Sequence, residues 1–305
     1  MPMFCRHNRL TANCPICSRE LQAELQSKAP PRARPARTGS ASSTAKRSPS
    51  RARTGAGRSG GVVTRRLARA ADDGYRNPLV PGIRATADAE RLAAALAATT
   101  ARLEPPGPYP EIASEPDLEE ATWLAFLLAL AGPQAPELQA AISEARPAWT
   151  SGELPELPVE RERTAAAYRA WAERAGSQQA AFRGEEVWTP ERRFARVFER
   201  LALPGFGRAA RFDLLTALGA AGRYELNAGE LQFDVGEDAT TEAAKRVLVS
   251  GDKLLLERRA RDLAAACGVP IAALDRGLAV WNTPGAGVDL AAEPPAAIRA
   301  ALELR

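Results

Sequence analysis

Runs of alanine, leucine, arginine and glutamate, each closed by glycine or proline, are the feature that most restricts the fold of this chain. Alanine and long unbranched side chains lose little conformational freedom in a helix. Residues 86–104 and 160–176 are two such runs, and Pro105 and Gly176 close them. Runs of valine, isoleucine, threonine and tyrosine, which favour strands, are almost absent. The sequence therefore predicts an all-α body.

The C-terminal half repeats this pattern. Thr189, Pro190 and Glu191 have the form of an N-cap, a proline at the first helical position and an acid in the first turn. Further helices are predicted over RRFARVFERLAL, GRAARFDLLTALGAAG, TTEAAKRVLVSG, DKLLLERRARDLAAACG and VPIAALDRGLAVWN. Residues 223–235 are the one stretch where a small β-hairpin is plausible, with the sequence NAG as its turn.

Charge is distributed unevenly along the chain. Residues 1–70 carry 15 lysines and arginines against two acids, whereas the remainder carries 26 basic and 35 acidic residues. Residues 26–61 are rich in Ser, Pro, Gly, Ala and Arg and contain no aromatic residue, so they bury too little apolar surface to offset chain entropy. We therefore expect a Cys/His unit at 1–20, a disordered basic linker at 21–61 and a helical domain at 62–305. A basic arm on an acidic body favours a polyanionic partner such as DNA, and a solubilising tail is the alternative.

Membrane and secretion signals are missing from the sequence as given. The longest apolar run, ATWLAFLLALAG, is shorter than the roughly 18–20 residues of a membrane span, and we expect it to be a buried helix. The first residues form no apolar signal-peptide core. These features favour a cytoplasmic protein without a membrane partner, where thiols stay reduced and clustered cysteines suggest a metal.

Three of the four cysteines and the only histidine fall in the stretch FCRHNRLTANCPIC. The four side chains are Cys5, His7, Cys14 and Cys17. A C-x2-C pair places two thiolates on one tetrahedral ion, and the nearby cysteine and histidine complete four ligands. Four ligands leave no open position, so the pattern predicts a structural rather than a catalytic Zn²⁺ site. Independent reduced cysteines are the alternative.

The stretch LALPGFGRAARFDLLTALG has the form of a helix-hairpin-helix. Its glycines permit a tight turn and close approach to a phosphate, and the amides at the start of the second helix point at that phosphate. Such a contact grips the backbone of duplex DNA without reading its bases. An ordinary turn between two helices is the alternative. The predicted DNA-binding residues are Pro204, Gly205, Phe206, Gly207, Arg208 and Arg211.

LPGFGRAA resembles the LPGVGxxTA hairpin of the helix-hairpin-helix DNA glycosylase superfamily. Together with FCRHNR…CPIC, RFDLL and ALDRGLAVW, it is similar to the alpha-glutamyl/putrescinyl thymine pyrophosphorylase proteins of that superfamily, which are associated with hypermodified thymine in DNA. The resemblance covers roughly residues 75–285 and the Cys/His unit. It implies a helical glycosylase-like domain that flips a target base out of the duplex.

The resemblance also implies an aspartate near the hairpin that stabilises positive charge on the sugar or activates an attacking group. The chain departs from the superfamily pattern in two ways: GRAARFDLL has no lysine nucleophile, and the usual VDTHV-type aspartate motif is absent. Candidate aspartates are Asp213, Asp252 and Asp275, with Asp234 in LQFDVGED as a further candidate. For each of these aspartates, the alternative to a catalytic role is an ordinary one as a helix cap or a surface ion-pair partner. Asp213 is the first choice because an acid between Phe212 and Leu214 needs a partner.

We therefore expect a DNA-binding, glycosylase-like enzyme acting on a modified or damaged thymine-like base, in DNA modification or DNA repair. Two alternatives stay open. One is a base-excision repair glycosylase that removes a damaged base. The other is a non-catalytic, zinc-containing DNA-binding or scaffold protein.

Overall fold

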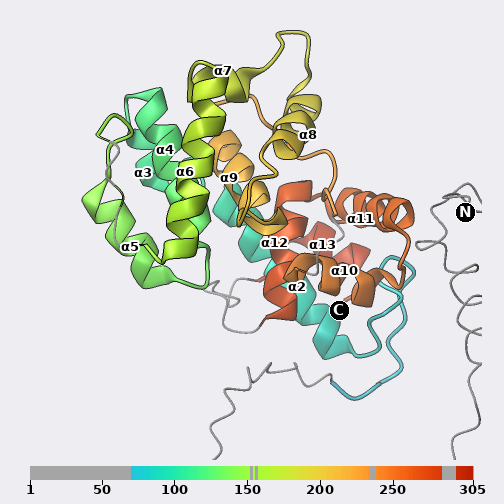
Figure 1. Cartoon of the computed structure of the whole chain (residues 1–305). Helices are drawn as coiled ribbons and strands as arrows, with labels where there is room; N and C mark the ends of the chain where they lie inside the picture. Colours follow the sequence, from blue (N-terminus) through green and yellow to red (C-terminus); the bar gives the residue numbers. More distant parts are fainter. Residues whose placement is uncertain (1–69, 152–153, 155–156, 234–237, 284–292, 305) are drawn as a thin grey trace, which may run out of the picture. The chain divides into compact units, whose positions relative to one another are not determined.

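The computed structural model describes residues 70–151, 154, 157–233, 238–283 and 293–304 (Figure 1). Helices are the regular secondary structure of this part of the chain, and it contains no strand. The all-α prediction is thus confirmed for these residues. The β-hairpin considered for residues 223–235 does not form in their described portion, which runs as irregular chain to Phe233. The Cys/His unit and the basic linker lie outside the described residues, as does Asp234.

The helices follow one another along the chain and are joined by loops of varied length. Their bounds are α2 Thr86–Leu103, α3 Pro110–Ser114, α4 Leu118–Ala131, α5 Pro136–Ala145, α6 Val159–Arg174, α7 Gln178–Arg183, α8 Pro190–Arg200, α9 Arg208–Ala220, α10 Ala239–Leu248, α11 Lys253–Cys267, α12 Ile271–Asn282 and α13 Ala296–Ala301.

Helix ends follow the predicted capping chemistry. The Thr189 side chain accepts a hydrogen bond from the Arg192 amide at the start of α8. Asp117 caps α4 by accepting from the Glu119 and Glu120 amides. Pro116 lies one residue before this cap. Such caps satisfy amides that have no partner within the helix, so local sequence sets these boundaries well.

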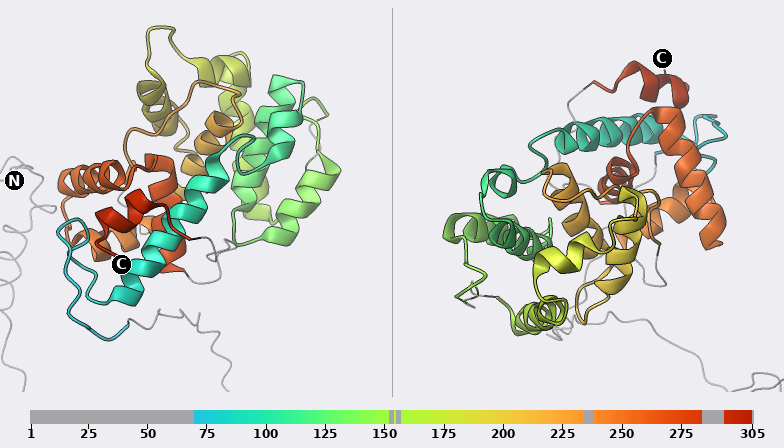
Figure 2. Two further views of the ribbon diagram at one scale, coloured as in Figure 1. Left: turned by 180° about the vertical axis from the view of Figure 1, so that it is seen from behind. Right: turned by 90° about the horizontal axis from the view of Figure 1, so that it is seen from above.

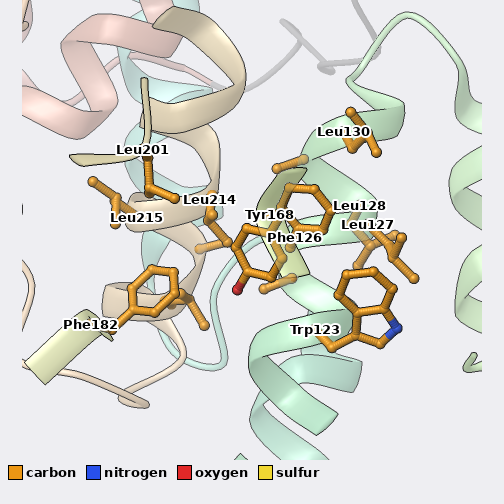
Figure 3. Packing of buried hydrophobic residues seen from close by; sticks show 14 of the residues in the cluster. Trp123, Phe126, Leu127, Leu128, Leu130, Tyr168, Phe182, Leu201, Leu214 and Leu215 are labelled. Atoms are coloured by element: carbon orange, nitrogen blue, oxygen red, sulfur yellow. The ribbon is translucent and has the colours of Figure 1, made fainter. Parts of the chain in front are cut away.

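Helix α4 is the centre of the first hydrophobic core. It is apolar on all sides, which is typical of a fully buried helix, and α3 and α5 to α9 contribute to the same core. The Phe126 ring stacks on Tyr168 of α6 with 3.8 Å between ring centroids, and Trp123 also stacks on Tyr168 (Figure 3). The longest apolar run in the sequence is therefore a core helix, as predicted.

The second core joins the two ends of the described chain. Helix α2 packs along α12, with α10, α11 and α13 completing the cluster (Figure 2). Gly277 of α12 permits this packing, because a Cβ there would lie 2.8 Å from a Leu96 methyl group. The Trp281 indole donates to the Asp88 carbonyl at 3.0 Å. Ile271, at the start of α12, contacts both cores, so the cores meet along α9 and α12.

None of the single helices among the described residues is long and apolar enough to cross a membrane. Helices α11 and α12 reach that length and apolarity only when taken together, and the two are bent by 102° relative to each other.

Candidate functional site

The predicted hairpin is a tight loop between α8 and α9. Gly205 adopts φ +76°, a left-handed conformation that favours glycine. The Thr164 hydroxyl of α6 donates to the Pro204 carbonyl at 3.0 Å, and a Cβ on Gly205 would collide with that hydroxyl oxygen. Thr164 therefore holds the loop against the first core. Pro204, Gly205 and Gly207 are exposed, so the loop backbone is accessible to a partner.

The remaining predicted DNA contacts of this loop are placed differently. Phe206 is only 2% exposed, and its ring lies 5.2 Å from the Phe126 ring between centroids. It anchors the loop in the first core. Arg211 is 6% exposed, lies 4.2 Å over the Phe198 ring and donates to the Phe198 carbonyl at 3.3 Å. Both side chains pack inside the domain, and the DNA contact predicted for these two residues stays a prediction.

Arg208, the first residue of α9, is also buried and belongs to a charge network. Its guanidinium donates to the Asp275 carboxylate and to the Leu231 carbonyl, and lies 3.6 Å from the Asp238 carboxylate. Burial lowers the pKa of Arg208, but Asp275 and Asp238 outweigh that effect and leave the pKa raised. The predicted phosphate contact of Arg208 is therefore replaced by an ion pair with α12. At the start of α9, Gly207 and Ala209 are exposed while Arg208 is buried.

Two pockets meet behind the hairpin, where the two cores join. Four residues line both pockets: Pro133, Asp213, Asp275 and Arg276. The first pocket is completed by Thr99, Arg102 and Leu103 of α2, by Pro108 and Tyr109, by Phe212 and Thr216 of α9, and by Ala272. The second is completed by Gln134, Ala209, the start of α10 and the end of α12. Two of the three predicted catalytic aspartates thus face one cavity system.

Asp213 is a titratable group of this site whose pKa lies near neutrality. It keeps some exposure to solvent through the pocket, because it lies on the partly exposed side of α9. Burial raises the pKa of the Asp213 carboxyl to about 6, and the Asp275 carboxylate also raises it. Arg276, Arg208 and Arg102 oppose these two effects. A carboxyl with a pKa near neutrality serves either as general acid or as general base.

Asp275 is held differently. It is 3% exposed and pairs directly with Arg208. Burial raises the pKa of Asp275, while the Arg208 charge and hydrogen bond lower it. The backbone carbonyl of the same residue accepts from the Thr240 hydroxyl at 3.1 Å. Asp275 is thus fixed in position by α9 and α10, and its charge acts on Asp213.

The third predicted aspartate lies elsewhere. Asp252 is exposed and is the N-cap of α11, where its carboxylate accepts from the Leu255 amide at 2.8 Å. It lines neither of the two pockets. Helix capping, the alternative role, therefore accounts for the contact that the Asp252 carboxylate makes.

Sequence reasoning missed the pocket residues that α2 and the following loop contribute. Tyr109, Arg102 and Thr99 precede the hairpin by about one hundred residues and carry no catalytic motif. The Arg102 guanidinium lies 5.8 Å from the Tyr109 ring centroid. A proline-rich loop between two predicted helices, PPGPYP, was the one local signal that this segment leaves regular structure near the site.

The predicted zinc ligands Cys5, His7, Cys14 and Cys17 lie outside the described residues. Among the residues that are described, no group of three or more His, Cys, Asp or Glu side chains is arranged to hold a metal ion. The remaining cysteine, Cys267, is buried in the second core, and burial raises the pKa of its thiol to about 11. It is a packing residue rather than a reactive one.

Comparison with known proteins adds no relative: no family model, curated protein or solved structure matches this chain.

Proposed function

We propose that this protein binds duplex DNA and carries out chemistry on a thymine-like base. One observation carries the proposal: Asp213 lies six residues after Gly207, on the helix that begins at the hairpin. Six residues span about 9 Å along a helix axis. A phosphate held at the start of α9 would therefore lie within one nucleotide's reach of the carboxyl in the pocket.

The division of roles in the proposal follows the burial of each group. The exposed loop backbone at Pro204, Gly205 and Gly207 and the first amides of α9 grip a phosphate. A base turned out of the duplex enters the pocket lined by Phe212 and Tyr109. Asp213 then gives or takes a proton. The basic residues before residue 70 add affinity through release of counterions from DNA.

The Cys5, His7, Cys14 and Cys17 side chains would hold a structural Zn²⁺ ion in this proposal. Three thiols and one imidazole form a donor set that suits tetrahedral zinc. A unit of about twenty residues has little core of its own, so the metal would supply its folding free energy. The unit would be a recognition module joined to the helical domain by the basic arm.

A test of the proposal uses full-length protein and duplexes that contain thymine, a hypermodified thymine or a damaged thymine at one position. Mass spectrometry of the DNA detects a base that is lost or altered. Wild-type protein should change at least one of these bases, and Asp213→Asn should bind equally well but react at least a hundredfold more slowly. Asp252→Asn is the matched control, because its carboxylate only caps α11.

The runner-up function, non-catalytic DNA binding, is favoured by one departure from the glycosylase pattern: α9 carries no lysine nucleophile. Tight binding to every duplex without a change in any base, in wild type and Asp213→Asn alike, would support that function. Failure to bind duplex DNA at low salt would reject both.

A further inference from the structure

The side-chain amide of Gln139 fixes the hydrogen bonding of Tyr109. Tyr109 is the N-cap of α3 and lines the first pocket with Asp213. Gln139 Nε2 of α5 lies 2.9 Å from Tyr109 Oη and 3.2 Å from the Leu128 carbonyl oxygen. A carbonyl oxygen only accepts hydrogen bonds, so the Gln139 atom beside it must be the nitrogen. The Tyr109 hydroxyl therefore accepts from Gln139.

The contact with Gln139 does not use the hydrogen of the Tyr109 hydroxyl. A phenol has a single O–H donor, and the contact with Gln139 uses its oxygen as acceptor. Within the described part of the chain, no acceptor is found for that hydrogen. Burial raises the pKa of Tyr109, and the Asp213 charge raises it further, so the phenol keeps its proton at neutral pH. The pocket thus contains a hydrogen-bond donor available to a ligand.

Asp213 supplies the complementary acceptor. Its pKa of about 6 leaves it mostly ionised at pH 8, and an ionised carboxylate only accepts. Tyr109 and Asp213 therefore offer one donor and one acceptor to the same cavity. Thymine has an oxo group beside a ring N–H, which matches this pair. Cytosine whose N1 is bonded to the sugar, as in DNA, has its amino group and its oxo group on either side of an unprotonated ring nitrogen, which opposes the pair. The Phe212 ring and two prolines supply apolar walls for a flat ring.

We propose that Tyr109 determines the specificity of the pocket: its hydroxyl donates to the oxo group of a thymine-like ring while Asp213 accepts from the adjacent ring N–H. The choice of a nucleobase as ligand rests on the proposed function. The requirement for an oxo group beside an N–H comes from the two side chains. Gln139 is a positioning residue for this contact because it donates to the Tyr109 oxygen and leaves the hydroxyl hydrogen for a ligand.

The experiment uses 1-methylthymine and 1-methylcytosine as probes, in which a methyl group blocks N1 as the sugar does in DNA, with full-length protein at pH 8 and binding followed by ligand-observed NMR. Wild-type protein should bind 1-methylthymine more tightly than 1-methylcytosine. Tyr109→Phe removes the hydroxyl and keeps the ring, and should weaken 1-methylthymine binding about tenfold, with less than a twofold change for 1-methylcytosine. Gln139→Leu should reduce the preference in part, because the Tyr109 hydrogen is then free to turn away.

Tyr75→Phe is the matched control. The Tyr75 hydroxyl donates to the Leu302 carbonyl at 2.7 Å in the second core, and Tyr75 lines neither pocket of the site. It should bind both bases like wild type. An unchanged preference in Tyr109→Phe, equal binding of both bases by wild type, or no binding of either base would each overturn the inference.

Failure of the proposed function gives a different result. Protein that binds 1-methylthymine through Tyr109 but changes no base in DNA would reject the function and keep the binding site. Protein that reacts with thymine in DNA equally well with and without the Tyr109 hydroxyl would reject the inference and keep the function.

Discussion

Arg208→Met provides a demanding test of the charge network at the start of α9. The substitution leaves Asp275, which is 3% exposed, without its cationic partner. Removing one member of a buried ion pair typically destabilises a protein by about 3–5 kcal/mol. Each kcal/mol lowers the melting temperature of a domain of this size by about 2–4 °C, so we expect a decrease of about 10 °C.

The pH dependence of this loss has a definite sign. Without Arg208, the pKa of Asp275 rises further above its unfolded value, because the arginine lowers it in wild type. The unpaired charge then disfavours the folded state at high pH and is removed by protonation as pH falls. The difference in free energy of unfolding between wild type and Arg208→Met should therefore be larger at pH 8 than at pH 5.

The assay is urea unfolding followed by circular dichroism in a double-mutant cycle with Asp275→Leu. The double variant has no buried charge to compensate, so it should be more stable than the sum of the single losses predicts, by about 3 kcal/mol. Arg261→Met, at an exposed arginine of α11, should change stability by less than ~0.5 kcal/mol. A loss under ~1 kcal/mol in Arg208→Met, or no coupling to Asp275, would refute the ion-pair argument.

Three further predictions concern the hairpin, the second core and the metal. Gly205→Ala should lower the free energy of unfolding by ~2 kcal/mol more than Gly222→Ala in urea unfolding; both glycines have positive φ, but only Gly205 is blocked, by Thr164. Equal losses would contradict that contact. Glu257→Gln should cost about 1–3 kcal/mol in the same assay, because the buried carboxylate accepts from the backbone amides of residues 231 and 233 and an amide nitrogen cannot; a neutral result would contradict this account. Metal analysis of full-length protein should find one zinc ion per chain and none in Cys14→Ser, and a metal-free wild type would reject the site.

The helices could be predicted because their signals are local. Thr189 caps α8, and the apolar run of α4 is buried, as periodicity and composition indicated. The tight loop between α8 and α9 was also predicted from its glycines. The start of α4 is set by Asp117, whose side chain accepts hydrogen bonds from the first amides of the helix, and not by the proline that precedes it.

The charge state and surroundings of the site could not be predicted in the same way. Arg208 looked like a phosphate ligand because it opens a helix, but it pairs with Asp275, 67 residues later in the sequence. Tyr109 joins the pocket only because α2 packs along α12 and directs the following loop toward α9. Contacts between segments so far apart leave no periodic signal in one sequence. Asp213 was predicted because an acid flanked by apolar residues needs a partner, and this residue does line both pockets.

Titration of the Asp213 carboxyl by NMR, in protein with ¹³C-labelled aspartate and with Asp213→Asn used to assign its signal, tests the central claim most directly. A raised pKa means that Asp213 takes up a proton near neutrality, losing its ability to act only as an acceptor below that pH. The account predicts a midpoint at pH of about 6. A midpoint near the ordinary aspartate value of about 3.9 would show that Asp213 is a solvated surface acid and contradict its role in the pocket.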